Sequence, residues 1–275
     1  MSKSLAFIAS LLVAFGCWAA DTGAPPAFAE TGQRRPILVN AFDDTIPQFV
    51  DGDSWQTTLI LTNLSTSTAY YRVYFNADNG DVVNFNIVGV GNASSIFGQL
   101  GPGQTVELAT PGTASTLTQG YASLFNYDRP ANDAARVAIP VRMGGMAVFR
   151  RRLPGLPDQE AVVPMSASFD RNFTIPFDNR NGFVSGVAIV NNSVANGVVS
   201  LTARDNTGAI LATDSFPLNF FTKVVYLVKD RYPALAGKAG ILQYSISAGG
   251  FSGLGLRFNP TGSFTSTHPL TLATQ

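Results

Sequence analysis

The chain contains very little histidine and cysteine. Among its 275 residues, His268 and Cys17 are the only examples of these two types. His268 lies close to the C-terminal end, where chains tend to fray, so a Ser-His-Asp triad built on it is not expected. Clustered His and Cys residues, which a zinc site requires, are absent as well. We therefore expect no enzymatic activity, no cofactor and, with a single cysteine, no disulfide.

Charged residues are also scarce, and they are balanced. They make up 13% of the chain, about half of the usual fraction of roughly 25%. The 18 basic residues cancel the 18 acidic ones, so no overall field attracts a polyanion. The one dense basic run, Arg150-Arg151-Arg152, continues an apolar strand and is typical of charges that protect a strand end from edge pairing. Nucleic acid is therefore not an expected partner.

Long apolar runs are missing from the sequence after residue 20, so we expect no transmembrane segment in the mature chain. The earlier run Leu5–Gly16 follows Lys3 and has the length of a secretory h-region. We predict a signal peptide over residues 1–20, with cleavage after Ala19 preferred over cleavage after Ala29. The mature protein is then secreted or held at the cell surface.

Cys17 allows a second interpretation of the leader. Ala14-Phe15-Gly16-Cys17 has the position of a bacterial lipoprotein cleavage box, which would acylate Cys17 and anchor the protein at its start. Such boxes usually carry Leu three residues before the cysteine, whereas this chain has Ala14 there and the bulky Phe15 next. The pattern favours a cysteine that is removed with the leader, and lipidation of Cys17 is the alternative.

The rest of the chain has the pattern of an all-β protein. Residues 21–35 are rich in Pro, Ala and Gly without periodicity, which indicates a flexible tether. From Pro36 onward, short runs of β-branched, aromatic and Leu residues alternate with Asn, Gly, Asp and Pro at spacings typical of antiparallel sandwiches. No stretch shows an amphipathic helical pattern, and Asp230–Gly237 allows a single helical turn.

An internal repeat divides this region into two parts. Shifting the chain by 128 residues places Gln56–Asn63 on Val184–Asn191 and Asn79-Gly80 on Thr207-Gly208. The offset then falls to 120 and to 108, so the first copy carries extra residues in two places. A period of this size is a whole domain. We predict two antiparallel β-sandwich (Ig-like) modules, 36–166 and 169–275, each with seven or eight strands.

These copies resemble an uncharacterised tandem β-sandwich repeat of secreted bacterial proteins. The resemblance covers Phe49 to Thr267 and is strongest at Pro176-Phe177-Asp178-Asn179 and at Leu256-Arg257-Phe258-Asn259-Pro260. It implies a sandwich fold and secretion. It implies no activity, because a fold does not determine a function.

One loop offers oxygen ligands for calcium. Asn76, Asp78 and Asp81 alternate along Asn76-Ala77-Asp78-Asn79-Gly80-Asp81, as at the start of a calcium loop. However, Ile87 stands where an EF-hand requires Glu, and Asn-Gly is a strong hairpin signal. The pattern favours an ordinary turn, with calcium as the alternative.

Aromatic residues provide a candidate carbohydrate surface. Trp55 begins a strand and Tyr70, Tyr71 and Tyr74 lie on the next one. The period of two places Tyr70 and Tyr74 on one face and Tyr71 on the other, so one set faces away from the core or is covered. Large aromatics more often serve as sandwich core, and we carry Trp55 and Tyr71 as the speculative ligand-binding pair.

The insertion between Tyr127 and Ala138 is the second candidate contact, because binding residues concentrate on loops of a rigid scaffold. Arg129, Asn132 and Asp133 are its speculative ligand-binding residues. We expect a secreted or cell-surface structural or adhesive protein, with a polysaccharide or a surface protein as partner, and edge strands leave self-association open. The alternatives are a carbohydrate-binding protein and a glycoside hydrolase with paired carboxylates such as Asp158 and Glu160.

Overall fold

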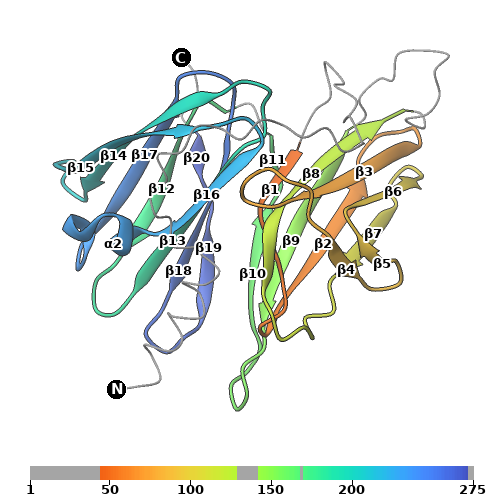
Figure 1. Ribbon diagram of the computed structural model, residues 1–275, viewed down its shortest axis with the longest axis horizontal. Helices are drawn as coiled ribbons and strands as arrows, with labels where there is room; N and C mark the ends of the chain where they lie inside the picture. The colour runs from red at the N-terminus through yellow and green to blue at the C-terminus, as the bar shows by residue number, and fades with distance from the viewer. Residues whose placement is uncertain (1–43, 129–141, 168–169, 272–275) are drawn as a thin grey trace.

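The computed structural model describes residues 44–128, 142–167 and 170–271, and this part of the chain is all-β (Figure 1). It contains antiparallel sheets, one short α-helix and one 3-10 turn. None of its helices has the length and apolar character needed to cross a bilayer. The predicted signal peptide, Cys17 and the tether lie outside the described residues and stay predictions.

The first group of strands forms two main sheets, consistent with a β-sandwich, which we call the first sandwich. Sheet A has the order β11-β1-β8-β3-β6 and sheet B the order β10-β9-β2-β7, while β4 and β5 form a separate hairpin. The strands are β1 (Asp44–Asp51), β2 (Trp55–Asn63), β3 (Ala69–Asn76), β4 (Phe85–Ile87), β5 (Gly91–Ala93), β6 (Ser95–Leu100), β7 (Thr105–Ala109), β8 (Thr118–Tyr127), β9 (Met143–Arg151), β10 (Gln159–Pro164) and β11 (Ser166–Ala167).

The second group also forms two sheets, which we call the second sandwich. Sheet D has the order β15-β14-β17-β12-β20, and sheet E the order β16-β13-β18-β19. Its elements are β12 (Asn172–Asp178), β13 (Val184–Asn191), β14 (Gly197–Asp205), β15 (Ile210–Leu218), β16 (Thr222–Leu227), α2 (Val228–Arg231), the 3-10 turn Pro233–Leu235, β17 (Ala239–Ile246), β18 (Ser252–Phe258), β19 (Phe264–Thr267) and β20 (Leu270–Thr271).

The two sandwiches have the same strand order when each strand is matched in chain order, leaving out β4 and β5. Their registers also agree. Asn76 pairs with Tyr121 and Arg204 pairs with Ile241, at offsets of 128 and 120 residues. Each sandwich has nine strands in its two sheets, more than the seven or eight expected, because the edges carry the two-residue strands β11 and β20.

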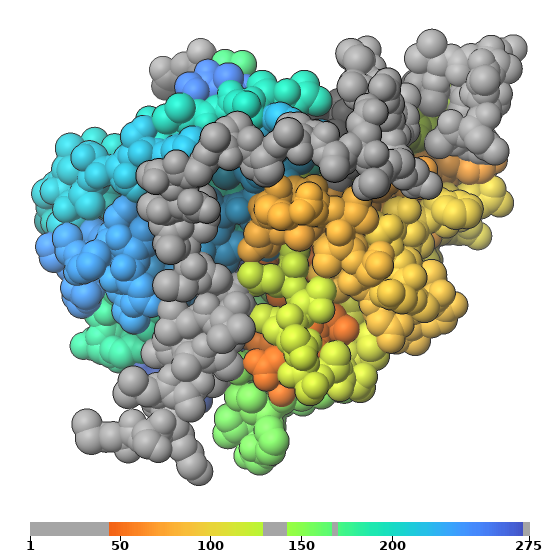
Figure 2. All heavy atoms as spheres, viewed as in Figure 1, coloured from red at the N-terminus to blue at the C-terminus, as the bar shows by residue number. Residues whose placement is uncertain are grey.

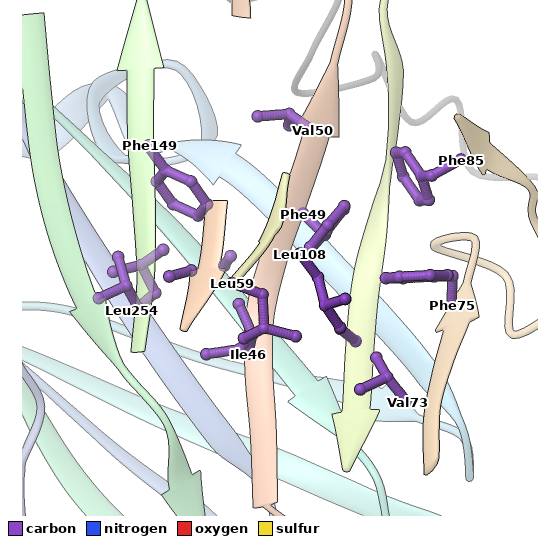
Figure 3. Close-up of a cluster of buried hydrophobic side chains, with 14 of the residues drawn as sticks. Ile46, Phe49, Val50, Leu59, Val73, Phe75, Phe85, Leu108, Phe149 and Leu254 are labelled. Carbon is purple, nitrogen blue, oxygen red and sulfur yellow. The ribbon is translucent and has the colours of Figure 1, made fainter. Parts of the chain in front are cut away.

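The core of the first sandwich follows from period-two alternation. Along β2, every second residue is buried, beginning with Trp55, and β3 shows the same alternation. Figure 3 shows the resulting cluster, in which Phe49 and Phe75 contact Phe85 from the β4–β5 hairpin. Burying a side chain of this size contributes about 1.5–3 kcal/mol. The hairpin therefore supplies core to the first sandwich and has no counterpart in the second.

Sheet E is buried on both faces, unlike an outer sheet of an isolated sandwich. Along β13, Val187 and Ile189 belong to the core of the second sandwich, whereas Val184 and Ala188 belong to the cluster of the first. Leu254 of β18 lies in that same cluster with Phe149 (Figure 3). Strands buried on both faces read as continuous apolar runs. One continuous core therefore crosses from the first sandwich into sheet E.

In each sandwich, one buried asparagine forms hydrogen bonds across the equivalent turn. Asn63 donates from Nδ2 to the carbonyls of Ser67 (2.7 Å) and Leu100 (2.9 Å), and its Oδ1 accepts from Ser65 N and Oγ. Asn191 makes the matching four bonds. Its partners are Ala195 O, Leu218 O, and Ser193 N and Oγ. Each buried side-chain amide therefore uses both of its N–H donors and its oxygen acceptor.

We expect Asn63→Asp and Asn191→Asp to destabilise the protein by about 2–4 kcal/mol each. The new oxygen would face two carbonyl oxygens in place of an amino group, leaving buried acceptors unsatisfied. Urea unfolding followed by circular dichroism measures the change. Asn86→Asp, at an exposed position of β4, is the matched control and should stay within about 0.5 kcal/mol. Equal stability of Asn63→Asp and the control would contradict this role.

Candidate interaction surface

The two aromatic residues proposed as a ligand surface are buried. Trp55 is 3% exposed and Tyr71 is 7% exposed. The Trp55 ring packs against Phe264 of the second sandwich at 5.1 Å, and the Arg151 guanidinium lies 5.0 Å from its centroid. This burial agrees with the favoured interpretation of large aromatics as sandwich core, and it does not support the speculative alternative in which Trp55 and Tyr71 bind a sugar at the surface. Both point inward on strands whose alternation places them in the core.

The loop at Asn79-Gly80 is a turn, as the sequence pattern favours. The calcium alternative stays a prediction, and its proposed ligands make other contacts in this structure. Asn76 is fully buried. The Asp78 carboxylate pairs with Lys223 (2.8 Å) and accepts from Gln119 Nε2 (3.0 Å), and Asp81 accepts from Asn79 Nδ2 (2.8 Å). No group of three His, Cys, Asp or Glu side chains comes together in residues 44–128, 142–167 and 170–271. The loop is a turn that carries an interface carboxylate.

The remaining candidates from the sequence are the residues of the insertion and the paired carboxylates. Arg129, Asn132 and Asp133 lie outside the described residues, so their role stays a prediction. Asp158 and Glu160 border a shallow pocket of ≈ 340 Å³ that Phe264 also lines. Both carboxylates pair with arginines of the predicted basic run. Arg150 contacts both of them, and Arg152 Nε lies 3.6 Å from Asp158. This is an ion-pair network and not a pair of free carboxylates facing a substrate.

Lys223 is the residue that sequence reasoning missed. It lies on β16, and its side chain is 0% exposed. Its ammonium group donates to Gln48 Oε1 (2.7 Å) and Gly120 O (2.7 Å) and pairs with Asp78 Oδ1 (2.8 Å). All three acceptors belong to the first sandwich. Burial lowers the pKa of Lys223, and the charge of Asp78 opposes that shift.

Further polar bonds cross the same boundary. Tyr121 donates through its hydroxyl to Phe221 O at 2.8 Å. Asn192 accepts from Ser123 Oγ (3.1 Å) and donates to Thr45 Oγ1 (2.8 Å). These partners lie on the outer side of β1 and β8. Polar bonds therefore hold the second sandwich to the outer face of sheet A, and the shared core joins sheet E to inward side chains of the first sandwich.

Gly80 shows how close the two parts approach. Its φ is +89°, and a Cβ at this position would lie 2.5 Å from Phe221 O of the second sandwich. A side chain here would therefore meet backbone and adopt a strained conformation. The Asn-Gly turn recognised in the sequence is thus part of the boundary between the sandwiches.

The outer face of sheet A also carries a set of aromatic side chains around one arginine, which we call the aromatic face. As predicted, Tyr70 and Tyr74 lie on the face opposite Tyr71. The Tyr74 ring meets Phe125 edge-on at 5.3 Å, and Arg72 lies 4.7 Å from the Tyr74 centroid. The members of the aromatic face are Tyr70, Arg72, Tyr74, Phe97 and Phe125.

Phe97 is the most exposed member of this face. Its exposed fraction is 81%, on the edge strand β6. Arg72 pairs with Phe97 on one side and with Phe125 on the other. Arg72 also contacts Ser95 Oγ at 3.4 Å. Exposed apolar patches with a polar rim are typical of interaction sites.

A cluster of tyrosines with Asp214 and Arg231 holds α2 against the second sandwich. The hydroxyls of Tyr226 and Tyr244 are 2.6 Å apart, and Tyr232 donates to Asp214 at 2.8 Å. The Arg231 guanidinium stacks on Tyr226 and pairs with Asp214. Burial raises the pKa of Tyr226 and Tyr244 far above the ordinary value.

Comparisons with protein-family models, with curated proteins and with solved structures find no match to this chain.

The burial of Trp55 predicts weak quenching of its fluorescence by iodide. The test uses the Trp18→Phe chain, because Trp18 is the only other tryptophan. We expect a blue-shifted emission maximum and quenching several-fold weaker than that of a tryptophan in a denatured sample of the same chain. Quenching as strong as in that sample would place Trp55 at the surface and restore the original prediction.

Proposed function

We propose that this protein is a secreted or cell-surface structural and adhesive scaffold without catalytic activity. The observation that carries the proposal is the fully buried Lys223, whose ammonium group from the second sandwich is satisfied only by acceptors of the first. A buried charge without its partners costs several kcal/mol. This cost opposes separation of the two sandwiches, and a rigid pair suits the presentation of a surface at a fixed position.

The scaffold is proposed to consist of two tandem Ig-like modules, 36–166 and 169–275. The identical strand order, the matching registers and the paired Asn63 and Asn191 turns support this view. The apolar leader after Lys3 supports export. A low charge content and the lack of clustered His and Cys agree with a structural role.

The aromatic face is the proposed contact surface. It combines the exposed Phe97 with partly exposed tyrosines and one guanidinium. A surface of this composition offers apolar area and hydrogen-bond donors, and Tyr and Arg are the residues that most often dominate binding energy. The rigid sheet beneath it keeps these side chains in register.

A carbohydrate is the second candidate ligand, and one observation favours it. Tyr74, Phe125 and Arg72 form a neighbouring group of ring faces and hydrogen-bond donors on a pleated sheet. The apolar face of a sugar ring can stack on an aromatic ring while its hydroxyls bond to a guanidinium. The site therefore replaces the buried Trp55 and Tyr71 in the carbohydrate-binding alternative.

The test is a pull-down of the leaderless chain with cell envelopes and with a panel of insoluble polysaccharides. Tyr74→Ala removes one ring of the aromatic face, and Phe220→Ala is the matched control because Phe220 is an exposed aromatic of the second sandwich. We expect envelope binding that falls at least several-fold in Tyr74→Ala and is unchanged in Phe220→Ala.

Three other results would change the assignment. Saturable binding to one purified polysaccharide, lost in Tyr74→Ala, would favour the carbohydrate-binding candidate. Release of soluble sugar from the panel would contradict a non-catalytic scaffold. Equal binding by the two variants would remove the aromatic face from the adhesive surface.

A further inference from the structure

Strand β6 is an edge strand with open backbone groups. It pairs only with β3 in sheet A. Phe75 N donates to Ser94 O at 2.9 Å, and hydrogen-bonded pairs alternate along an antiparallel ladder. The N–H and C=O groups of Ser95, Phe97 and Gln99 therefore point away from β3, toward the free edge. No hydrogen bond from another described residue is made to these groups.

This edge lacks the features by which strands are protected from pairing. Natural edges carry charges, proline or bulges, or are very short. β6 reads Ser-Ile-Phe-Gly-Gln-Leu, and its register with β3 is regular. Figure 2 shows the yellow segment that contains β6 on the flank opposite the second sandwich. The free edge is thus distant from the boundary between the sandwiches.

The corresponding strand of the second sandwich is protected. Tyr70 pairs with Gln99, and at the matching position Val198 pairs with Pro217 of β15. Proline has no N–H to donate to an incoming strand. β15 also carries Asp214 and a register shift opposite Ala203. The same edge is therefore closed in one sandwich and open in the other.

The other edges of the main sheets in the described residues are very short, carry a charge, lie beside another strand or end in a helix. β11 and β20 have two residues each, and β7 carries Glu107. β16 continues directly into α2. β10 and β19 lie side by side, with Ser266 Oγ donating to Val162 O at 2.6 Å. Within residues 44–128, 142–167 and 170–271, β6 is thus the long edge that lacks such features, and pairing through one edge gives a closed pair and not a filament.

We propose that β6 pairs in antiparallel fashion with β6 of a second copy of this chain, so that sheet A continues across a two-fold axis. Opposite residues of an antiparallel pair lie on the same face, so Phe97 must face an outward residue of the other copy. When Phe97 pairs with Phe97 of the second copy, the backbone N–H and C=O groups of Ser95, Phe97 and Gln99 all form hydrogen bonds with the second copy. The two phenylalanine rings then form a cross-strand aromatic pair.

Charge and composition favour a second copy as the occupant. In the proposed dimer, one row of side chains crosses the two-fold axis. It contains Arg72 and Phe97 of one copy, followed by Phe97 and Arg72 of the second copy. The two arginines are three strand spacings apart, about 14 Å, which exceeds the Debye length of about 8 Å at physiological ionic strength. The chain has a formal net charge of zero, so no long-range repulsion opposes self-association. This inference concerns assembly and holds whichever ligand the aromatic face binds.

The first experiment measures the mass of the full-length chain by sedimentation velocity over a range of concentrations. We expect a monomer–dimer equilibrium that Phe97→Lys and Gln99→Pro shift at least tenfold toward monomer. Gln99→Pro gives β6 a proline at the position that matches Pro217, which blocks pairing at the edge of β15. Val194→Lys is the matched control, because Val194 is 75% exposed in the second sandwich, and it should leave the equilibrium unchanged. Thermal unfolding of each variant checks that it folds.

The second experiment tests the register. In a Cys17→Ser background, Ser95→Cys and Gln99→Cys place thiols on residues that face each other across the axis. Oxidation should cross-link a mixture of the two variants and neither variant alone, because like positions are about 14 Å apart. A chain that stays monomeric, a dimer that survives both Phe97→Lys and Gln99→Pro, or cross-linking of one variant alone would overturn the proposal.

Discussion

The ammonium group of Lys223 is the constraint on which the arrangement of the two sandwiches depends. Removing a charge of this kind from water costs several kcal/mol unless good partners replace the lost hydration. Here the replacements are Gln48, the carbonyl of Gly120 and the carboxylate of Asp78, all from the first sandwich. Strand β16 therefore reaches its observed environment only when the first sandwich is folded against it.

The shared core has the same effect on the apolar side. Sheet E places alternate residues of its central strand β13 in two different clusters, so neither face of this strand is left for water. An isolated second sandwich would expose Val184, Ala188 and Leu254 to solvent. Trp55 would likewise lose its contact with Phe264. The boundary is built like the interior of one domain, although the strand order repeats.

The two sandwiches nevertheless differ in what they offer to partners. The first carries the additional β4–β5 hairpin, the aromatic face and the open β6 edge. The second closes the equivalent edge with Pro217 and uses sheet E to cover the first sandwich. In the proposed function, these differences place contact with other molecules on the first sandwich and support of that sandwich on the second.

Much of the strand pattern could be predicted from the sequence, because alternation along β2 and β3 and the turn at Asn79-Gly80 are local properties. The alternation along β2 also favours a buried Trp55, but its contact with Phe264 of the second sandwich could not be predicted, since Phe264 is distant in sequence. The sequence of β13 is a uniform apolar run, so it does not indicate which side chains face the core of the first sandwich and which face the core of the second. Lys223, a lone cation between Phe221 and Val224 in an apolar strand, was a signal of the boundary that the sequence did contain.

Differential scanning calorimetry tests most directly whether the two sandwiches form one rigid unit. The account predicts a single transition whose calorimetric and van't Hoff enthalpies agree. Lys223→Ala should lower the midpoint markedly or split the transition, while Lys229→Ala, which removes a partly exposed lysine of α2, should leave it nearly unchanged. Two separate transitions in the unaltered chain, or equal behaviour of the two variants, would contradict the account.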